Sequence, residues 1–200
     1  MHDKWLLLIY ALPAQPSRLR LSIWRDLKGA GALYLRDGVT VLPDRPPSRA
    51  MLEAIAKRVE ELGGEATLVV NAELDQSRHD ELLDRFARAR AGEYEELLRQ
   101  CRRFMSHLQR ETDHYEFTYQ ELEELAEELD KIRRWQEKVR GRDYFNHEAA
   151  AVLEGERRAC EEALAAFGGE AFEREHGELA RAGIPRTPAK EETDALDNPR

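Results

Sequence analysis

The first seventy-six positions combine short apolar runs with hydrophobic residues at helical spacing. Residues 4–12 form a continuous apolar run bounded by turn residues, a pattern typical of a central strand covered on both faces. A helix is then predicted from Ser17, its expected N-cap, to the glycines at 29 and 31. Because Leu19, Ile23, Leu27 and Ala30 share one side of this helix, we assign that side to the core.

A hairpin, a second helix and a last strand follow. Residues 32–43 contain two alternating runs around Asp37-Gly38, a dipeptide that accepts the positive φ of a tight hairpin turn. Apolar residues then recur at helical spacing from Leu52 to Leu62, and residues 65–74 read as a strand. The order strand, helix, hairpin, helix, strand predicts an α+β fold with a ferredoxin-like βαββαβ domain at residues 1–76.

Three helical patterns occupy most of the remaining chain. The first runs from about His79 through Leu108, with Gly92 as an expected weak point. The second follows Thr118-Tyr-Gln-Glu121, which has the form of a capping box, and its apolar residues have a heptad-like spacing that requires a partner. With a third helix at about 147–167, these patterns predict a C-terminal antiparallel helical subdomain at residues 77–176.

The composition of the chain also predicts a disordered tail and a cytoplasmic location. The 200 residues, 42% hydrophobic and 36% charged, suit one large or two small soluble domains. We expect residues 177–200 to form a disordered polar tail, because this proline-containing end offers too little apolar surface to offset the entropy of ordering. No apolar run approaches the ~20 residues that span a bilayer, and none resembles a signal peptide. We therefore expect a cytoplasmic protein without a membrane partner.

The net charge of −9 is unevenly distributed. Residues 1–110 hold 18 Lys and Arg against 16 Asp and Glu, or +2, and the remaining 13 against 24 give −11 for residues 111–200. A mildly basic first half is compatible with a local anion-binding face, whereas the total argues against a strongly salt-driven, non-specific DNA-binding protein.

The helix expected at 17–29 carries the first candidate site. Arg18, Arg20, Arg25 and Lys28 lie away from its core face, with Trp24 among them. A solvated helix face explains these charges without any ligand. Alternatively, an exposed aromatic side chain between arginines could stack on bases or cover a partner surface. On this second interpretation the five residues form a nucleic-acid-binding face.

A second candidate lies in the next helical pattern. Arg99, Arg102 and Arg103 could clamp a tetrahedral anion, because guanidinium donors match paired oxygens. Cys101 between them could be a redox-responsive thiol if these charges lower its pKa. It also shares an apolar stripe with Leu97 and Met105, which instead predicts a packed, inert thiol. We expect both cysteines, Cys101 and Cys160, to be reduced and partly buried.

Other chemistry is poorly supported by the sequence. Asp113 and His114, with His107 upstream and His147 downstream, could enter a metal or acid–base site, but adjacent loop residues converge poorly on one ion. Neither a glycine-rich phosphate loop, a nucleophile elbow nor a zinc-hydrolase motif occurs. We therefore expect no metal site, no cofactor and no enzymatic activity.

Several separated blocks of the chain resemble one family. The blocks "WLLLIYALPAQPSRLRLSIWRDLKGAGALYL", "ELGGEATLV" and "KIRRWQEKVRGRDYF", in this order, are similar to the N-terminal region of ChrB-type chromate resistance proteins. This resemblance implies a cytoplasmic, DNA-linked regulator that responds to chromate or a related oxyanion. Longer members continue into a second domain, so the resemblance also implies a stand-alone version or a partner protein that carries that domain.

The first strand and helix are also similar to the ferredoxin-like domain of phenylacetate-degradation repressors and CRISPR-adaptation nucleases. Those nucleases commonly have an aspartate after the tyrosine that ends the first strand, and here Tyr10 is followed by Ala11. Without this carboxylate, two-metal hydrolysis lacks its anchor. The resemblance therefore implies the fold and not the activity.

Two functions remain open at this point. The first is a transcriptional regulator of chromate resistance that binds DNA and an oxyanion. The alternative is a non-catalytic interaction module, whose acidic heptad-like helix recruits a separate sensing or DNA-binding partner. Homodimerisation through a sheet edge or this helix fits either function.

Overall fold

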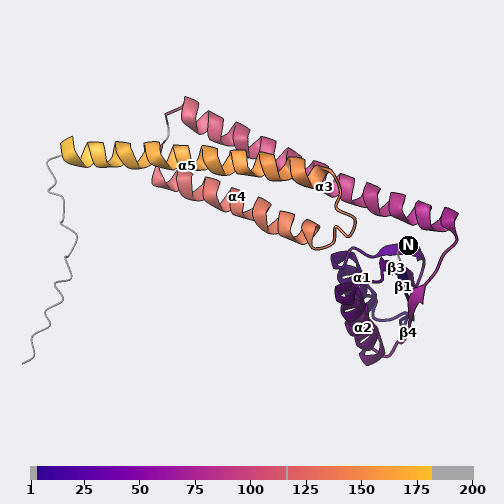
Figure 1. Ribbon diagram of the computed structural model, residues 1–200. Helices are drawn as coiled ribbons and strands as arrows, with labels where there is room; N and C mark the ends of the chain where they lie inside the picture. Colours follow the sequence, from indigo (N-terminus) through magenta and orange to yellow (C-terminus); the bar gives the residue numbers. More distant parts are fainter. Residues whose placement is uncertain (1–3, 116, 182–200) are drawn as a thin grey trace, which may run out of the picture.

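The computed structural model describes residues 4–115 and 117–181, and its N-terminal part is a four-stranded sheet with two helices on one face (Figure 1). Its elements are β1 (Trp5–Ala11), α1 (Ser17–Gly29), β2 (Leu33–Arg36), β3 (Val39–Pro43), α2 (Pro46–Glu61) and β4 (Glu65–Ala72). The strands lie in the order β2-β3-β1-β4, and every neighbouring pair is antiparallel. The mixed α+β class and the predicted succession of these elements are confirmed.

The hairpin between β2 and β3 depends on its glycine. Gly38 has a φ of +71°, and a Cβ atom there would lie 2.5 Å from the carbonyl oxygen of Tyr10. The Tyr10 amide donates a 2.7 Å hydrogen bond to the Gly38 carbonyl, so the turn approaches β1 closely. Both the left-handed backbone and this close approach exclude a side chain.

The assignment of the core face of α1 is confirmed. Ile23 and Leu27 are fully buried and Ala30 is 2% exposed, which leaves the opposite side of the helix to solvent. The prediction that Ser17 caps this helix is wrong: Pro16 occupies the N-cap position, and no side chain accepts a capping hydrogen bond there. The fixed φ of proline supplies an extended residue before the first turn without a polar cap.

Three long helices form an antiparallel bundle that extends well beyond the sheet (Figure 1). They are α3 (Gln76–Asp113), α4 (Tyr119–Arg140) and α5 (Ala149–Arg181). The predicted cap of α4 is confirmed, since the Thr118 hydroxyl accepts a 3.1 Å hydrogen bond from the Glu121 amide. Gly92 is not a break, because the surrounding turns of α3 pack on both sides of it and outweigh its low helix propensity.

The predicted tail begins too early. Helix α5 continues to Arg181, so residues 177–181 are helical, while residues 182–200 lie outside the described part of the chain. The buried Phe167 and Ala171 keep the helix packed past the end that the apolar pattern predicted. None of the helices in the described ranges combines the length and apolar character that crossing a bilayer requires.

Helix α3 belongs to two hydrophobic cores. Its residues Leu82 and Phe86 pack with Trp5 in the core of the sheet, where the Trp5 and Phe86 rings stack with centroids 5.8 Å apart. From Tyr94 onward, α3 contributes to the core of the bundle. The packing therefore divides within α3, later in the chain than the predicted boundary between residues 76 and 77.

The heptad-like stripe of α4 has its partner within the same chain. Leu125, Leu129, Ile132 and Val139 are at most 4% exposed, and they pack against residues of α3 and α5. The apolar side of α4 is thus buried in the bundle core, and its acidic side faces outward. A partner protein that used this helix would have to bind the acidic side.

Candidate functional site

The predicted basic side of α1 is exposed in the structure. We define the α1 basic face as Arg18, Arg20, Trp24, Arg25 and Lys28, all of which are exposed. Trp24 keeps 42% of its surface accessible, and the Lys28 ammonium lies 4.9 Å from the centre of its ring. This cation–π contact holds the indole among the positive charges.

The charges of the α1 basic face are not neutralised by neighbouring acids. Asp26, the only acidic residue of α1, pairs with Arg58 of α2 at 2.5 Å. Among the described residues, none of the four cations of the face forms an ion pair. The face therefore combines four free positive charges with an accessible aromatic ring.

An apolar residue extends this face. Leu21, three residues before Trp24 on the helix, is 45% exposed. Residues three apart are neighbours on a helix surface, so Leu21 and Trp24 form a small apolar patch among the cations. Aromatic residues and arginines are also enriched at protein interfaces, and the geometry thus suits either bases or a protein partner.

The predicted anion clamp is arranged differently. Arg99, Arg102 and Arg103 share one exposed side of α3, but the Arg99 guanidinium is engaged by Glu96 and approaches Glu95 at 4.0 Å. Its Nε donates to Glu96 at 2.9 Å, and this hydrogen bond lowers the pKa of the Glu96 carboxyl. Arg102 and Arg103 keep their exposed charges, whereas an anion at Arg99 would have to compete with two carboxylates.

Cys101 lies on the other side of α3 from these arginines. It is fully buried, as is Cys160 of α5, and the Cys160 thiol lies 3.7 Å from the Cys101 carbonyl oxygen. A hydrogen bond from the Cys160 thiol lowers the pKa of Cys101, and the same bond, with burial, raises the pKa of Cys160. The thiol's environment is thus set by its buried partner and not by Arg99, Arg102 and Arg103, and a redox role for Cys101 stays a prediction.

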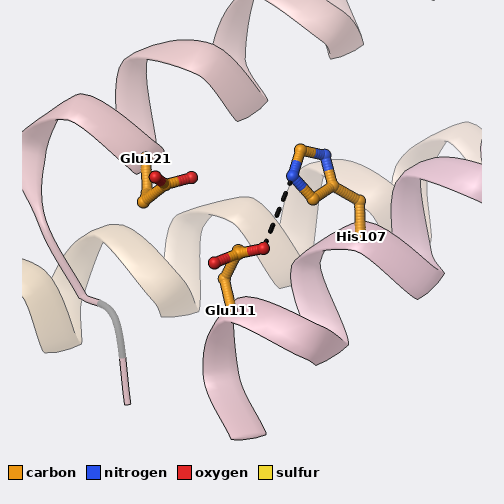
Figure 2. A group of neighbouring side chains, drawn as sticks. All are labelled: His107, Glu111 and Glu121. Carbon is orange, nitrogen blue, oxygen red and sulfur yellow. Dashed lines mark ion pairs between the residues drawn. The ribbon is translucent and has the colours of Figure 1, made fainter. Parts of the chain in front are cut away.

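A histidine and carboxylates gather near the loop between α3 and α4. His107 and Glu111 lie one turn apart on α3, and Glu121 reaches toward them from the first turn of α4 (Figure 2). One donor atom from each of the three side chains lies within 4.8 Å of the other two. His107 Nε2 is 3.6 Å from Glu111 Oε1, and Nδ1 is 3.0 Å from Glu128 Oε2.

The sequence pointed to the wrong partners for His107. Asp113 and His114 are exposed at the end of α3, and the Asp113 carboxylate accepts a hydrogen bond from Gln109. His147 lies instead beside Tyr94, with ring centroids 5.7 Å apart. The i, i+4 spacing of His107 and Glu111 was a usable signal, whereas the approach of Glu121 depends on how α4 folds back on α3.

Comparisons with known proteins bear on the identity of the chain. Residues 20–178 match the family model described as "Protein ChrB, N-terminal". The chain is also 46% identical over 52 residues to "Protein ChrB" of Cupriavidus metallidurans, a match that covers 26% of this chain and 16% of that protein. The chain thus aligns with well under two thirds of that relative. No solved structure matches it.

Proposed function

Since this chain belongs to the family of ChrB N-terminal regions, we propose that it is a regulator of chromate resistance that contacts DNA through the α1 basic face. Family membership supports the link to chromate resistance. The DNA contact is supported by the four exposed cations, unpaired within the described residues, and by the indole of Trp24 among them. Cations without internal partners can release counterions from DNA phosphates at no cost to an existing ion pair.

The proposal has a structural and a cellular part. The strand order β2-β3-β1-β4 supports a ferredoxin-like type for the βαββαβ unit, in which α1 and α2 cover one face. A regulator of this kind acts in the cytoplasm, where the DNA of the genes that it regulates lies. Its response to chromate or a related oxyanion requires no catalytic step. Arg102 and Arg103 are the part of the anion clamp that is free for such a ligand.

Electrophoretic mobility shift and fluorescence anisotropy with a fragment of the protein's own promoter test the DNA contact. The full chain should bind at moderate salt, and the double variant Arg20→Glu, Arg25→Glu should lose this binding, because two attractive contacts become repulsive. Chromate should change the affinity of the unmodified chain.

A matched control keeps the total charge change equal. The double variant Arg88→Glu, Arg134→Glu changes the net charge by the same amount, but these arginines already pair with Asp84 and Asp130 within their own helices. It should retain most of the DNA affinity. If both double variants lose binding equally, only the overall charge matters, and α1 is not the contact surface.

A second candidate function is recruitment of a protein partner. The exposure of Leu21 beside Trp24 favours it, since an apolar patch among arginines is typical of a protein contact. On this hypothesis the chain binds a separate sensing or DNA-binding protein, and it shifts no promoter fragment alone. Leu21→Asn, which removes the apolar surface without adding a charge, should then abolish a defined complex with that protein, while leaving any DNA affinity of the chain nearly unchanged.

A further inference from the structure

We propose that His107, Glu111 and Glu121, with Glu128 behind the histidine, form a binding site for a divalent transition-metal ion. The inference is independent of the DNA contact, because the cluster lies at the α3–α4 end of the bundle and α1 lies at the sheet end (Figure 1). It also concerns a different ligand chemistry, since three carboxylates repel an oxyanion.

The hydrogen bond between His107 and Glu128 places one proton of the imidazole on Nδ1. A carboxylate can only accept, so Nδ1, 3.0 Å from Glu128 Oε2, must carry the proton of that contact. In a neutral imidazole Nε2 is then a bare lone pair. That lone pair faces Glu111 Oε1 at 3.6 Å, and two acceptors face each other.

This arrangement is favourable only if a cation lies between the acceptors. A second proton on the imidazole supplies one solution, and a metal ion bound to Nε2 supplies the other. Metal-binding histidines commonly donate their other ring N–H to a carboxylate, which orients the ring and makes the ligating nitrogen a better donor to the metal. The hydrogen bond from His107 to Glu128 has this arrangement. Glu128 therefore serves as a positioning residue, and His107, Glu111 and Glu121 serve as ligands.

The distances suit an ion of ordinary size. An ion about 2.1 Å from each donor places its ligand atoms about 3–4 Å apart, so donors already within 4.8 Å need only small side-chain adjustments. The side chains are held by the bundle, because Leu108 follows His107 and Leu125 lies between Glu121 and Glu128, and both leucines belong to the same buried cluster. His107 is 27% and Glu111 is 14% exposed, which leaves a path for the ion while limiting water.

The surrounding charge attracts cations. Residues 119–130 contain six acidic side chains and neither lysine nor arginine. The mixture of one imidazole with carboxylates favours Zn²⁺, Ni²⁺, Co²⁺ or Fe²⁺ over Mg²⁺ and Ca²⁺, because the latter prefer oxygen ligands alone.

Isothermal titration calorimetry of the full, chelator-treated chain with Zn²⁺ tests the site, with Mg²⁺ in a parallel titration. We expect one equivalent of Zn²⁺ and no comparable binding of Mg²⁺. The variants His107→Ala, Glu111→Gln and Glu121→Gln should each weaken Zn²⁺ binding at least tenfold. Matched controls are His114→Ala, an exposed histidine at the C-cap of α3, and Glu127→Gln, an exposed glutamate that pairs with Lys131. Both variants should bind Zn²⁺ within about twofold of the unmodified chain.

Co²⁺ gives a second readout that identifies the ligands. The visible absorption of bound Co²⁺ should depend on His107, and Zn²⁺ should raise the melting temperature of the unmodified chain but not of His107→Ala. Circular dichroism of each variant checks its fold, and the three ligand variants test the site independently if one of them unfolds. Absence of saturable 1:1 binding, or binding that survives in all three ligand variants, would overturn the proposal while leaving the promoter experiment unaffected.

Discussion

The α1 basic face and the bundle helices differ in how their surface cations are paired. In the bundle, most pairs join neighbouring turns of one helix, as in Arg88–Asp84, Lys131–Glu127 and Arg134–Asp130. In α1 of the sheet region, none of the four cations of the basic face has an acidic residue three or four positions away, and Asp26, the only acid of this helix, is bound to Arg58. Two helix faces with the same number of cations can therefore differ in function. A face whose cations are paired with acids is a solvated surface, whereas a face with unpaired cations is available to a polyanion.

The two halves also differ in how their cores are built, yet they share one element. Aromatic rings of Trp5, Phe86 and Phe145 meet where α3 packs on the sheet, whereas the bundle core combines leucines and buried aromatic residues with two thiols that the sheet core lacks. Because α3 supplies residues to both cores, a disturbance in one half should reach the other. The predictions below test this coupling and the contrast between free and paired cations.

Replacement of Trp5 by alanine should have the largest effect. Trp5 is fully buried, and its indole N–H donates to His79 of α3 at 3.2 Å. Loss of the ring should lower the free energy of unfolding by about 3–5 kcal/mol. Urea unfolding followed by far-ultraviolet circular dichroism, to which the bundle contributes most, and by tryptophan fluorescence, which Trp24 of α1 and Trp135 of the bundle then supply, should show one shifted transition. Two separate transitions, with the bundle unchanged, would show that α3 does not couple the halves.

Tyr94→Phe should have the next largest effect. The Tyr94 hydroxyl donates to the Asp143 carboxylate at 2.8 Å, and burial raises the pKa of this phenol. Loss of a hydrogen bond to a charged group should cost about 2 kcal/mol of unfolding free energy. Tyr119→Phe is the matched control, since Tyr119 is 50% exposed, and it should change the stability by less than about 0.5 kcal/mol. Equal effects of the two substitutions would show that the hydrogen bond from Tyr94 to Asp143 does not stabilise the bundle.

The contrast between free and paired cations makes a third prediction. Arg25→Ala should reduce the slope of log K against log salt for promoter binding by about 0.9, the contribution of one phosphate contact. Arg134→Ala should leave this slope unchanged, because Arg134 pairs with Asp130 in the free protein. Anisotropy titrations between 50 and 200 mM salt, about the range in which such slopes are resolved, measure both values. A reduced slope for Arg134→Ala would mean that pairing within a helix does not remove a cation from DNA contact.

The local features of the fold were predictable from the sequence. The hairpin at Gly38, the core face of α1 and the cap at Thr118 each follow from residues within a few positions of one another. The cap of α1 was not, since a serine after a proline has the usual appearance of an N-cap, but Pro16 takes that position. Propensity cannot decide between adjacent residues when both fit the extended backbone before a helix.

The features that depend on tertiary contacts were not predictable. The exposure of the α1 basic face could be inferred, but the neutralisation of Asp26 by Arg58 joins residues 32 positions apart. The partnership of Cys101 with Cys160 and the approach of Glu121 to His107 likewise follow from the packing of α3 against α5 and α4. Periodicity identifies which side of a helix is buried, whereas the facing residues are fixed only when the helices are placed.

The smallest effect on stability is expected for Trp24→Ala, and this makes it the sharpest comparison with Trp5. Trp24 is 42% exposed and its clearest contact is the Lys28 ammonium, so the unfolding free energy should fall by only about 1 kcal/mol, the loss of an exposed cation–π contact. If the α1 basic face stacks on bases, the same substitution should weaken promoter binding by about 1–3 kcal/mol. Trp24→Phe keeps a flat ring and should restore most of that loss. A large loss of stability, or unchanged DNA affinity in a stable variant, would show that the ring serves the fold or another partner, because only stacking predicts that affinity falls while stability changes little.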